Sequence, residues 1–305
     1  MKGQMKLEGK KQVNHDFFGY LPCKWDIKFE GGSISPIQEF DQVSAVIDKY
    51  KDKEGFIYPE DAQQIRSDLS SLVPDMFTFE PPSPFFQYVY TSHVLCLRDT
   101  EADIRKGSGA FLIYLLAYLF GVRLQFKGWW HDGRIPVKST HNIHPTKKTV
   151  EKFLSHCYQL WKGWPATEQK LITNILYMHS RAPSYEWDWE QFMIEYTVFD
   201  GCWKLTEIIH KLPRPKHPKR FTVLCKKFSI PYDKTLIAEI VQLRTDLLHE
   251  TLWSGGQPCT ATDGPGLAAS FHLRRFNQRL IPAIFFGYDT PYVRTPWWIM
   301  GTFSF

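Results

Sequence analysis

The sequence predicts an α+β region of about 145 residues followed by an all-helical bundle. Before residue 145, short segments rich in β-branched and aromatic residues are bounded by Gly, Pro and Asp, as strands usually are. After it, apolar residues recur at helical spacing in five successive segments with modest loops between them, which is typical of a helical bundle. The chain is therefore divided near Pro145 into regions 1–145 and 146–305.

Length and composition restrict the class of protein. With 305 residues and 43% hydrophobic content, the chain can form one large core or two ordinary ones, so a disordered or fibrous protein is not expected. The formal net charge is only +5. This mildly basic balance permits an acidic partner such as nucleic acid without requiring one.

The sequence also indicates a reducing compartment. The basic N-terminus leads into polar residues rather than an apolar segment, so a secretory signal is not expected. The longest apolar run, 110–122, is short for a membrane span. The cysteines stand singly, with no spacing typical of a disulfide framework or zinc knuckle. We expect a soluble cytoplasmic protein with reduced thiols, no membrane attachment and no cofactor. The cysteines are Cys23, Cys96, Cys157, Cys202, Cys225 and Cys259.

Strands and two short helices are expected in the first region. The segments KWDIKFEGGSISPI (24–37) and FQYVYTSHVLCLRD (86–99) have the residue types of strands. SAVIDKYKDK (44–53) and PEDAQQIRSDLSSLV (59–73) are interpreted as helices, the second with acidic residues in its first turn, where the helix dipole favours them. FEPPSPFF (79–86) is rich in proline and is expected to be a loop.

The apolar run 110–122 predicts a buried helix. The segment after it, 123–148, is rich in Gly, Pro and polar residues and is interpreted as the connection into the second region. Within it, the loop WWHDGR (129–134) places polar residues beside aromatic ones, and packing against the bundle is favoured over a functional role.

The second region is expected to hold five helices. The best defined begins at Asp233, whose side chain can cap it, and SGGQP (254–258) is expected to stop it. Its apolar face consists of Leu236, Ile237, Ile240, Leu243, Leu247 and Leu248. The five helices are expected over 147–162, 167–181, 188–211, 233–253 and 267–282.

A basic, proline-rich stretch, 210–227, connects the third and fourth of these helices. Several Lys and Arg side chains on one segment can neutralise phosphates and bind an RNA backbone without sequence preference. A solvated linker is an equally good interpretation of the composition. The candidate RNA-binding residues are Lys211, Arg214, Lys216, Lys219 and Arg220.

Arg244 and His249 stand at the polar end of the Asp233 helix. Four residues separate the two. With thirteen Arg and eleven His in 305 positions, about 0.5 Arg–His pairs at this spacing are expected by chance, so the spacing alone is weak evidence for a functional site. Asp246 lies one turn before His249 and can hold the imidazole in position. The alternative is a solvated Arg244 and Asp246 ion pair beside a helix-end histidine that the dipole favours.

The stretch RTDLLHE (244–250) resembles the R-x4-6-H signature of the HEPN superfamily, named for higher eukaryotes and prokaryotes nucleotide-binding domains. The resemblance covers about residues 145–290. It implies a helical bundle with the motif on a late helix and a homodimer in which both protomers line one cleft. It also implies metal-independent endoribonuclease activity, as in toxin and anti-phage defence systems. One departure is Thr245, because active members commonly carry Asn, Asp or His there.

Such residues suit RNA cleavage. The ribose 2′-hydroxyl is a built-in nucleophile, and its attack on the adjacent phosphate needs a base and a cation for the gathering charge. His249 suits the first role and Arg244 the second, without a metal, and the products are a 2′,3′-cyclic phosphate and a 5′-hydroxyl. Whether His249 is base, acid or phosphate ligand stays open. The resemblance then suggests the N-terminal region as sensor or regulator, and a regulatory partner is possible.

Two other functions remain open. Thr245 favours a non-catalytic HEPN-like module that binds nucleic acid, nucleotide or a partner protein. A metal-dependent hydrolase using His131, His141 and His144 is less favoured, because no spaced Cys or carboxylate accompanies these histidines.

Overall fold

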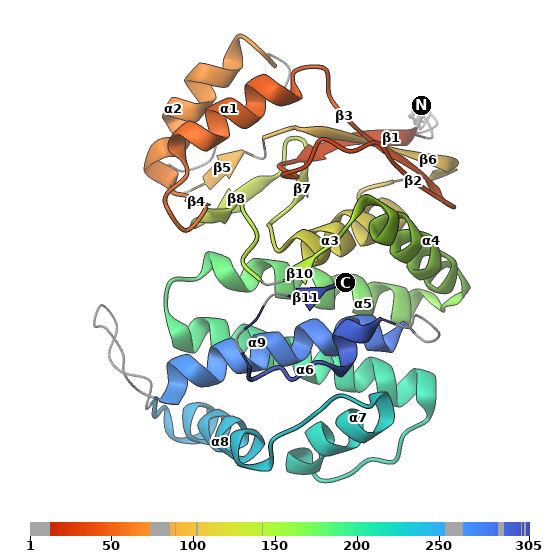
Figure 1. The fold of residues 1–305 in the computed structure, drawn as a ribbon, viewed down its shortest axis with the longest axis vertical. Helices are drawn as coiled ribbons and strands as arrows, with labels where there is room; N and C mark the ends of the chain where they lie inside the picture. Colours follow the sequence, from red (N-terminus) through yellow and green to blue (C-terminus); the bar gives the residue numbers. More distant parts are fainter. Residues whose placement is uncertain are drawn as a thin grey trace, which may run out of the picture.

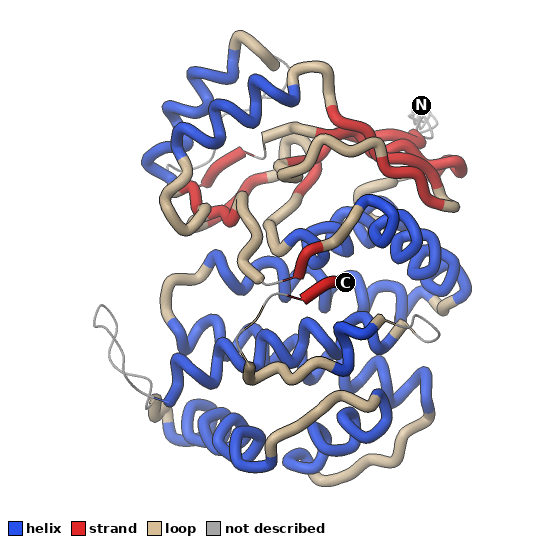
Figure 2. The backbone as a smooth tube through the Cα atoms, viewed as in Figure 1, coloured by secondary structure: helices blue, strands red, loops and turns tan. Residues whose placement is uncertain are grey.

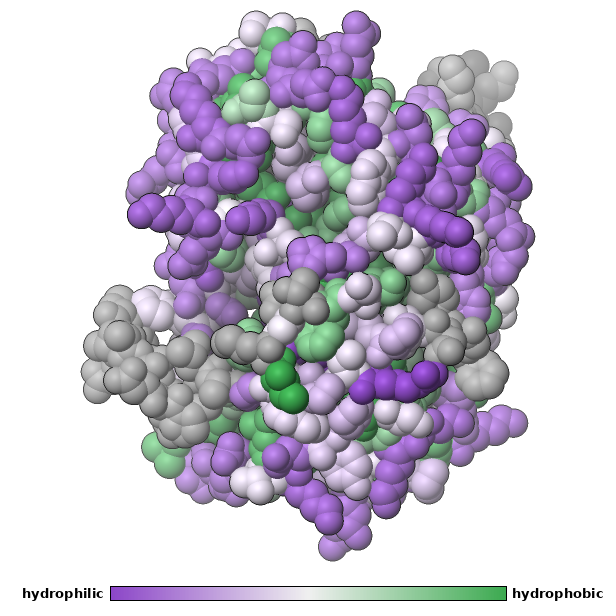
Figure 3. Space-filling view, in the orientation of Figure 1, coloured by the Kyte–Doolittle hydropathy of each residue, from purple (hydrophilic) through white to green (hydrophobic). Residues whose placement is uncertain are grey.

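The fold is seen in a computed structural model that describes residues 13–73, 86–88, 90–101, 103–141, 143–253, 265–285, 290–299, 301 and 303–305. A sheet and two helices form one end of the molecule, and helices form the other (Figures 1 and 2). This arrangement confirms the predicted order of an α+β region followed by a helical one. Hydrophilic side chains cover most of the face in Figure 3, including the part over α1 and α2.

The main sheet has five strands in the order β2-β3-β6-β1-β7, and all of its pairs are antiparallel. Its strands β2, β3 and β6 confirm the two predicted strand segments. Strand β1, which lies between β6 and β7 in the sheet, was not predicted. Apolar and polar residues do not alternate regularly in its sequence, VNHDFFG. The strands are β1 (Val13–Gly19), β2 (Ile27–Phe29), β3 (Gly32–Pro36), β6 (His93–Glu101) and β7 (Gln125–Phe126).

Helices α1 (Phe40–Tyr50) and α2 (Pro59–Ser70) match the two short helices expected in this region, with α1 starting earlier. Val43 and Ile47 of α1 join Leu69 of α2 in a small apolar core beneath them. Of the predicted loop 79–86, residues 79–85 lie outside the described residues, and Phe86 begins a strand. Two small sheets lie beside α2: β4 (Phe56–Ile57) pairs with β9 (Ile135–Pro136), and β5 (Phe86–Tyr88) with β8 (Trp130–Asp132).

Helix α3 (Ser108–Phe120) lies between the sheet and the helical part (Figure 1). All 13 of its residues are buried, which explains why the run is apolar on every side. At its end, Gly121 adopts a positive φ of 61° and its N–H bonds to the carbonyls of Ala117 and Tyr118. The predicted buried helix is therefore confirmed.

The helical part is built around α6, which packs against α5 and α9. Helix α4 begins with a capping box, in which the side chains of Thr146 and Thr149 each bond to the other's backbone N–H. The predicted helices match α4 (Lys147–Gly163), α5 (Ala166–Arg181), α6 (Asp188–His210) and α9 (Pro265–Ile284) closely.

The basic stretch contains a helix that the sequence analysis missed. Helix α7 (Arg220–Phe228) buries Phe221, Leu224 and Cys225. The prolines of the basic stretch all precede Arg220, so the chain after the last proline is free to form helical hydrogen bonds. The stretch is therefore part linker and part helix.

Helix α8 (Lys234–Thr245) is shorter than the expected 233–253. Oδ1 of Asp233 accepts hydrogen bonds from the N–H groups of Thr235 and Leu236 at 2.8 and 3.0 Å, which confirms the predicted cap. A π-helical segment, Asp246–Glu250, follows. It ends at Thr251, whose φ is 58°.

The wider π turn changes which side chains face the core. Ile237, Ile240 and Leu243 are buried as expected, but Leu248 is 45% exposed. The apolar stripe predicted to reach Leu248 therefore ends earlier, because a π turn contains more residues than an α turn and shifts the faces that follow. The expected stop signal, 254–258, lies outside the described residues.

The C-terminal segment returns to the centre of the molecule. Strand β10 (Ile143–His144) pairs in parallel with β11 (Phe303–Ser304), and Phe305 packs on Phe153 with ring centroids 4.9 Å apart. The segment 123–148 thus carries short strands besides its turns. One apolar core contains residues from both sides of Pro145. A division there into separate domains stays a prediction.

Two further observations concern the cysteines and the length of the helices. Within the part of the chain that the structure describes, Cys23, Cys96, Cys157, Cys202 and Cys225 are free thiols, and Cys259 lies outside it. No helix among those residues has the length and apolar character needed to cross a membrane.

Candidate functional site

Arg244 and His249 lie in contact at the end of α8. Nη1 of Arg244 is 3.4 Å from Nε2 of His249, with the arginine half-buried and the imidazole exposed. Residues five apart on a regular α-helix are rotated by about 140° from one another. The π segment widens this turn, because its hydrogen bonds join residues five apart, as the Thr251 N–H to Asp246 carbonyl bond does. The local helix geometry thus brings the two side chains together.

Asp246 does not occupy the position expected for it. Its Oδ1 accepts a hydrogen bond of 2.6 Å from Nε2 of Gln242, and no hydrogen bond joins it to His249. Thr245 Oγ1 donates to the Val241 carbonyl at 3.0 Å. The threonine hydroxyl is thus directed at its own helix. The supporting role of Asp246 at His249 stays a prediction without a contact behind it.

Arg244 also faces a group of residues from other elements. Its guanidinium carbon lies 5.9 Å from the ring centroid of Tyr196, which is on α6. Burial raises the pKa of Tyr196, as does Asp200, while Arg244 and Arg220 act in the opposite direction. We call Tyr196, Asp200, His217, Arg220 and Arg244 the Tyr196 cluster.

A second histidine belongs to this cluster. The His217 ring stacks on Tyr196 with centroids 5.7 Å apart and an angle of 19° between the planes. Its Nε2 lies 3.4 Å from Oδ1 of Asp200, and Nη1 of Arg220 donates to that same oxygen at 2.9 Å. Burial is the main cause that lowers the pKa of His217; Asp200 acts in the opposite direction, and Arg220 and Arg244 lower the pKa further. The neutral imidazole is therefore favoured.

Sequence reasoning missed His217, Asp200 and Tyr196. They come from α6 and from the 3₁₀ turn His217–Lys219, so no spacing along the chain relates them to Arg244. A neutral histidine, a carboxylate and two arginines can bind a phosphate and exchange a proton.

The five candidate RNA-binding residues lie in the chain segment that contributes His217 and Arg220 to this cluster. Lys211, Arg214, Lys216 and Lys219 are exposed, and Arg220 is half-buried within the cluster. Arg214 pairs with Glu207. Neither Lys216 nor Lys219 forms an ion pair with another described residue.

A hollow of about 290 Å³ lies between the basic stretch and α6. Its lining includes Arg214, Arg220 and Lys204, with Asp200 and Glu207 as the carboxylates, so cations slightly outnumber anions. Trp203 also lines it, and the Arg220 guanidinium lies 5.5 Å from the Trp203 ring. An aromatic face beside cations is the combination that single-stranded RNA binding uses.

The three histidines proposed for a metal are not brought together. His131 is buried in β8, His144 is exposed in β10, and Nε2 of His141 lies 2.6 Å from the Tyr118 carbonyl. Burial chiefly lowers the pKa of His141, to about 3. Among the described residues, no group of three or more His, Cys, Asp or Glu is arranged to hold a metal ion.

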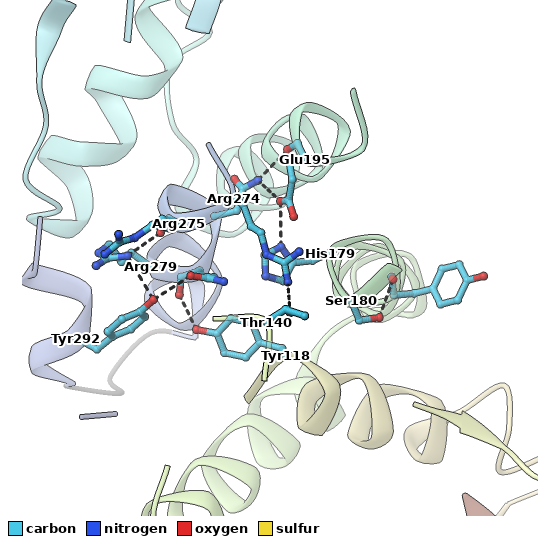
Figure 4. Close-up of polar contacts among 12 residues, drawn as sticks. Tyr118, Thr140, His179, Ser180, Glu195, Arg274, Arg275, Arg279 and Tyr292 are labelled. Carbon is cyan, nitrogen blue, oxygen red and sulfur yellow. Dashed lines mark hydrogen bonds and ion pairs between the residues drawn. The ribbon is translucent and has the colours of Figure 1, made fainter. Parts of the chain in front are cut away.

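A buried polar network joins α5, α6 and α9, and no sequence pattern indicated it (Figure 4). Glu195 is 1% exposed, and its Oε2 accepts hydrogen bonds from Nδ1 of His179 at 3.0 Å and Nδ2 of Asn277 at 2.8 Å. Asn277 Nδ2 also bonds to the Glu195 backbone carbonyl at 2.8 Å. A buried carboxylate with two polar partners holds three helices in one register.

Buried arginines on α9 attach the C-terminal segment. Arg279 donates to the carbonyls of Thr295 and Pro296 at 2.7 and 3.0 Å. Its guanidinium lies 4.7 Å from the Tyr292 ring centroid, and Figure 4 shows these two side chains together. Burial lowers the pKa of Arg279. Because its donors are directed at backbone carbonyls, we assign Arg279 a structural role.

Comparison with protein-family models, with curated proteins and with solved structures found no match to this chain. The candidate site therefore rests on the contacts described above.

Proposed function

We propose that the protein is a metal-independent endoribonuclease whose site is Arg244 and His249, in a HEPN-like helical bundle. The observation that carries the proposal is the contact of 3.4 Å between these two side chains, formed across a π turn at an exposed helix end. π turns occur often at functional sites. The sequence resemblance and this contact support the same pair independently.

The chemistry follows from the two groups. His249 takes the proton of the ribose 2′-hydroxyl or delivers one to the leaving oxygen, and Arg244 binds the phosphate oxygens where charge gathers. The Tyr196 ring lies beside the Arg244 guanidinium, and neutral His217 stacks on that ring. These two rings limit the directions in which the guanidinium can point. The products are a 2′,3′-cyclic phosphate and a 5′-hydroxyl.

RNA binding by the basic stretch extends this proposal. Of Lys211, Arg214, Lys216, Lys219 and Arg220, the last belongs to the Tyr196 cluster and the other four are exposed residues that precede it along the chain. A homodimer with a composite site also belongs to the proposal. Leu248 and Leu252, which are 45% and 57% exposed beside His249, support self-association there. A role in growth arrest or defence, with the N-terminal region as sensor or regulator, follows from the resemblance alone.

Cleavage of mixed RNA in the presence of a chelator tests the activity. We expect the unaltered protein to yield fragments ending in 2′,3′-cyclic phosphate, and Arg244→Ala and His249→Ala each to lower the rate by about 100-fold or more. Exposed Arg98 and His15 on the sheet provide matched controls, because Arg98→Ala and His15→Ala remove the same groups elsewhere. Equal RNA integrity in all samples would contradict the proposal.

The second candidate is a non-catalytic module that binds nucleic acid. The Thr245 side chain supports it, because its hydroxyl is bonded to the Val241 carbonyl and offers its proton to no substrate. This candidate predicts that RNA binds to the protein, that Lys216→Ala and Lys219→Ala weaken binding, and that no cleavage occurs. A filter-binding assay run beside the cleavage assay distinguishes the two.

A further inference from the structure

A hollow of about 810 Å³ lies between the main sheet and the helical part, far along the chain from Arg244. The first turns of α3, the β7 to β8 connection and α5 form its walls. Its apolar surface is aromatic to an unusual degree. Trp129, Trp130 and Trp161 line it together with Tyr114 and Tyr177, whose two rings lie 5.2 Å apart. Flat faces of this kind are suited to stacking on a planar aromatic ligand.

The charged side chains that line the hollow are all cationic. Arg105, Lys106 and Lys170 line it, and no carboxylate does so among the described residues. Asp16 and Asp103, which pair with Arg105 and Lys106, lie outside the lining. Lys170 is exposed and forms no ion pair with any described residue. Because Arg105 and Lys106 are neutralised by their partners, Lys170 is the group that gives the hollow a net positive charge, which favours an anionic ligand.

A buried amide lies in the wall of this hollow. Gln125 is 4% exposed, and its Oε1 is fully enclosed without a hydrogen-bond partner among the described residues. Leaving a buried polar group unpaired costs about 1–3 kcal/mol, so such groups generally have a partner. An amide carries both a donor and an acceptor, the pair that the edge of a nucleobase presents.

The N-terminus of α3 faces the same space. Gly107 and Ala110, at the N-terminus of α3, line the hollow. Backbone N–H groups in the first turn of a helix have no hydrogen-bond partner within the helix, so they can bind phosphate oxygens. The helix dipole also favours negative charge at this end. Together with the unpaired Lys170, this end of the hollow is suited to a phosphate.

We propose that this hollow is a nucleotide-binding site. The base stacks among the tryptophans and tyrosines and bonds to the Gln125 amide, and the phosphate lies between the α3 N-terminus and Lys170. The ligand chemistry is an aromatic base joined to a phosphate, which either a free nucleotide or the 5′-phosphorylated end of a nucleic acid supplies. The proposal does not depend on catalysis at Arg244 and His249.

Isothermal titration of the full chain tests the site. The probes are AMP, UMP, adenosine, inorganic phosphate and a 5′-phosphorylated DNA tetranucleotide, which lacks the 2′-hydroxyl needed for cleavage. We expect a nucleotide to bind about tenfold or more tightly than either adenosine or phosphate alone, because both ends of the hollow are then used. Binding of the tetranucleotide alone identifies a nucleic-acid end as the source, and binding of AMP or UMP identifies free nucleotides.

Two variants locate the binding. Lys170→Glu reverses the unpaired charge, and Gln125→Leu removes the amide while keeping the side chain's size, so each should weaken binding by about tenfold or more. Lys152→Glu, on the exposed face of α4 and outside the hollow, is the control and should bind like the unaltered protein. Thermal unfolding checks that each variant folds. Absence of saturable binding for every probe, phosphate binding as tightly as nucleotide, or equal binding by Lys170→Glu would each overturn the proposal.

Discussion

Nη1 of Arg244 lies 3.4 Å from Nε2 of His249 although the two residues stand five positions apart on one helix. This contact depends on the π segment that begins at Asp246. If the pair acts on a phosphate, the forked shape of the guanidinium matters as well as its charge.

Arg244→Lys keeps the charge and removes the fork, so we expect kcat/KM for RNA cleavage to fall by about tenfold or more. The unfolding midpoint should stay within about a degree, because the side chain is half-buried and makes few hydrogen bonds. Single-turnover cleavage and thermal unfolding check both statements. Full activity in the lysine variant would show that a point charge is sufficient.

RNA affinity should depend on salt through the basic stretch. Each unpaired lysine that contacts a phosphate contributes about 0.7 to the slope of log affinity against log salt for a single strand. Lys216→Ala and Lys219→Ala should each reduce that slope by roughly this amount. The control is Lys152→Ala on α4. A slope that is the same in all three variants would remove the stretch from the interface.

Self-association should depend on the apolar residues next to His249. Leu248→Glu and Leu252→Glu place charge on a surface that the proposed dimer covers, so we expect both variants to be monomers where the unaltered protein is a dimer. Multi-angle light scattering measures the mass. Ile208→Glu, at a comparably exposed position on α6, is the control and should leave the mass unchanged. A monomeric unaltered protein would exclude the composite site.

The buried Glu195 network should contribute strongly to stability. Glu195→Ala leaves His179 and Asn277 without their shared acceptor, and breaking such a buried interaction costs about 3–5 kcal/mol. Urea unfolding measures the loss. Exposed Glu186 lies a few residues before α6, and Glu186→Ala should cost less than about 0.5 kcal/mol. A small loss for Glu195→Ala would mean that water replaces the missing carboxylate.

Stability should fall on mild acidification because of His141. Its pKa is about 3 in the folded protein and about 6.5 in an exposed imidazole, so the unfolded state binds more protons between these values. The free energy of unfolding should therefore be constant above pH 6.5 and decrease below it, by roughly 2 kcal/mol at pH 5 from this group. Urea unfolding at pH 7 and pH 5 measures the change. His141→Gln should reduce it, and an equal decrease in that variant would exclude His141 as the cause.

Local features were readable from the sequence because neighbouring residues encode them. The Asp233 cap requires only an oxygen near two free N–H groups, and the uniform apolar run 110–122 requires only burial on all sides. Helix α7 was missed because the prolines before Arg220 dominate the composition of its surroundings. The π turn was missed because its residues carry no pattern that differs from an α-helix.

The sequence by itself determined the α+β and helical regions, most helix boundaries, and the choice of Arg244 and His249 as candidates. Only the tertiary structure decided that these two side chains touch, that His217 and Tyr196 join Arg244, and that Gln125 faces an aromatic, cationic hollow. The physical reason is range. Periodicity and capping act over one or two helical turns. Arg244 and His249 meet because the helix widens locally into a π turn, whereas the other groups come from separate elements that meet only when those elements pack around a common core.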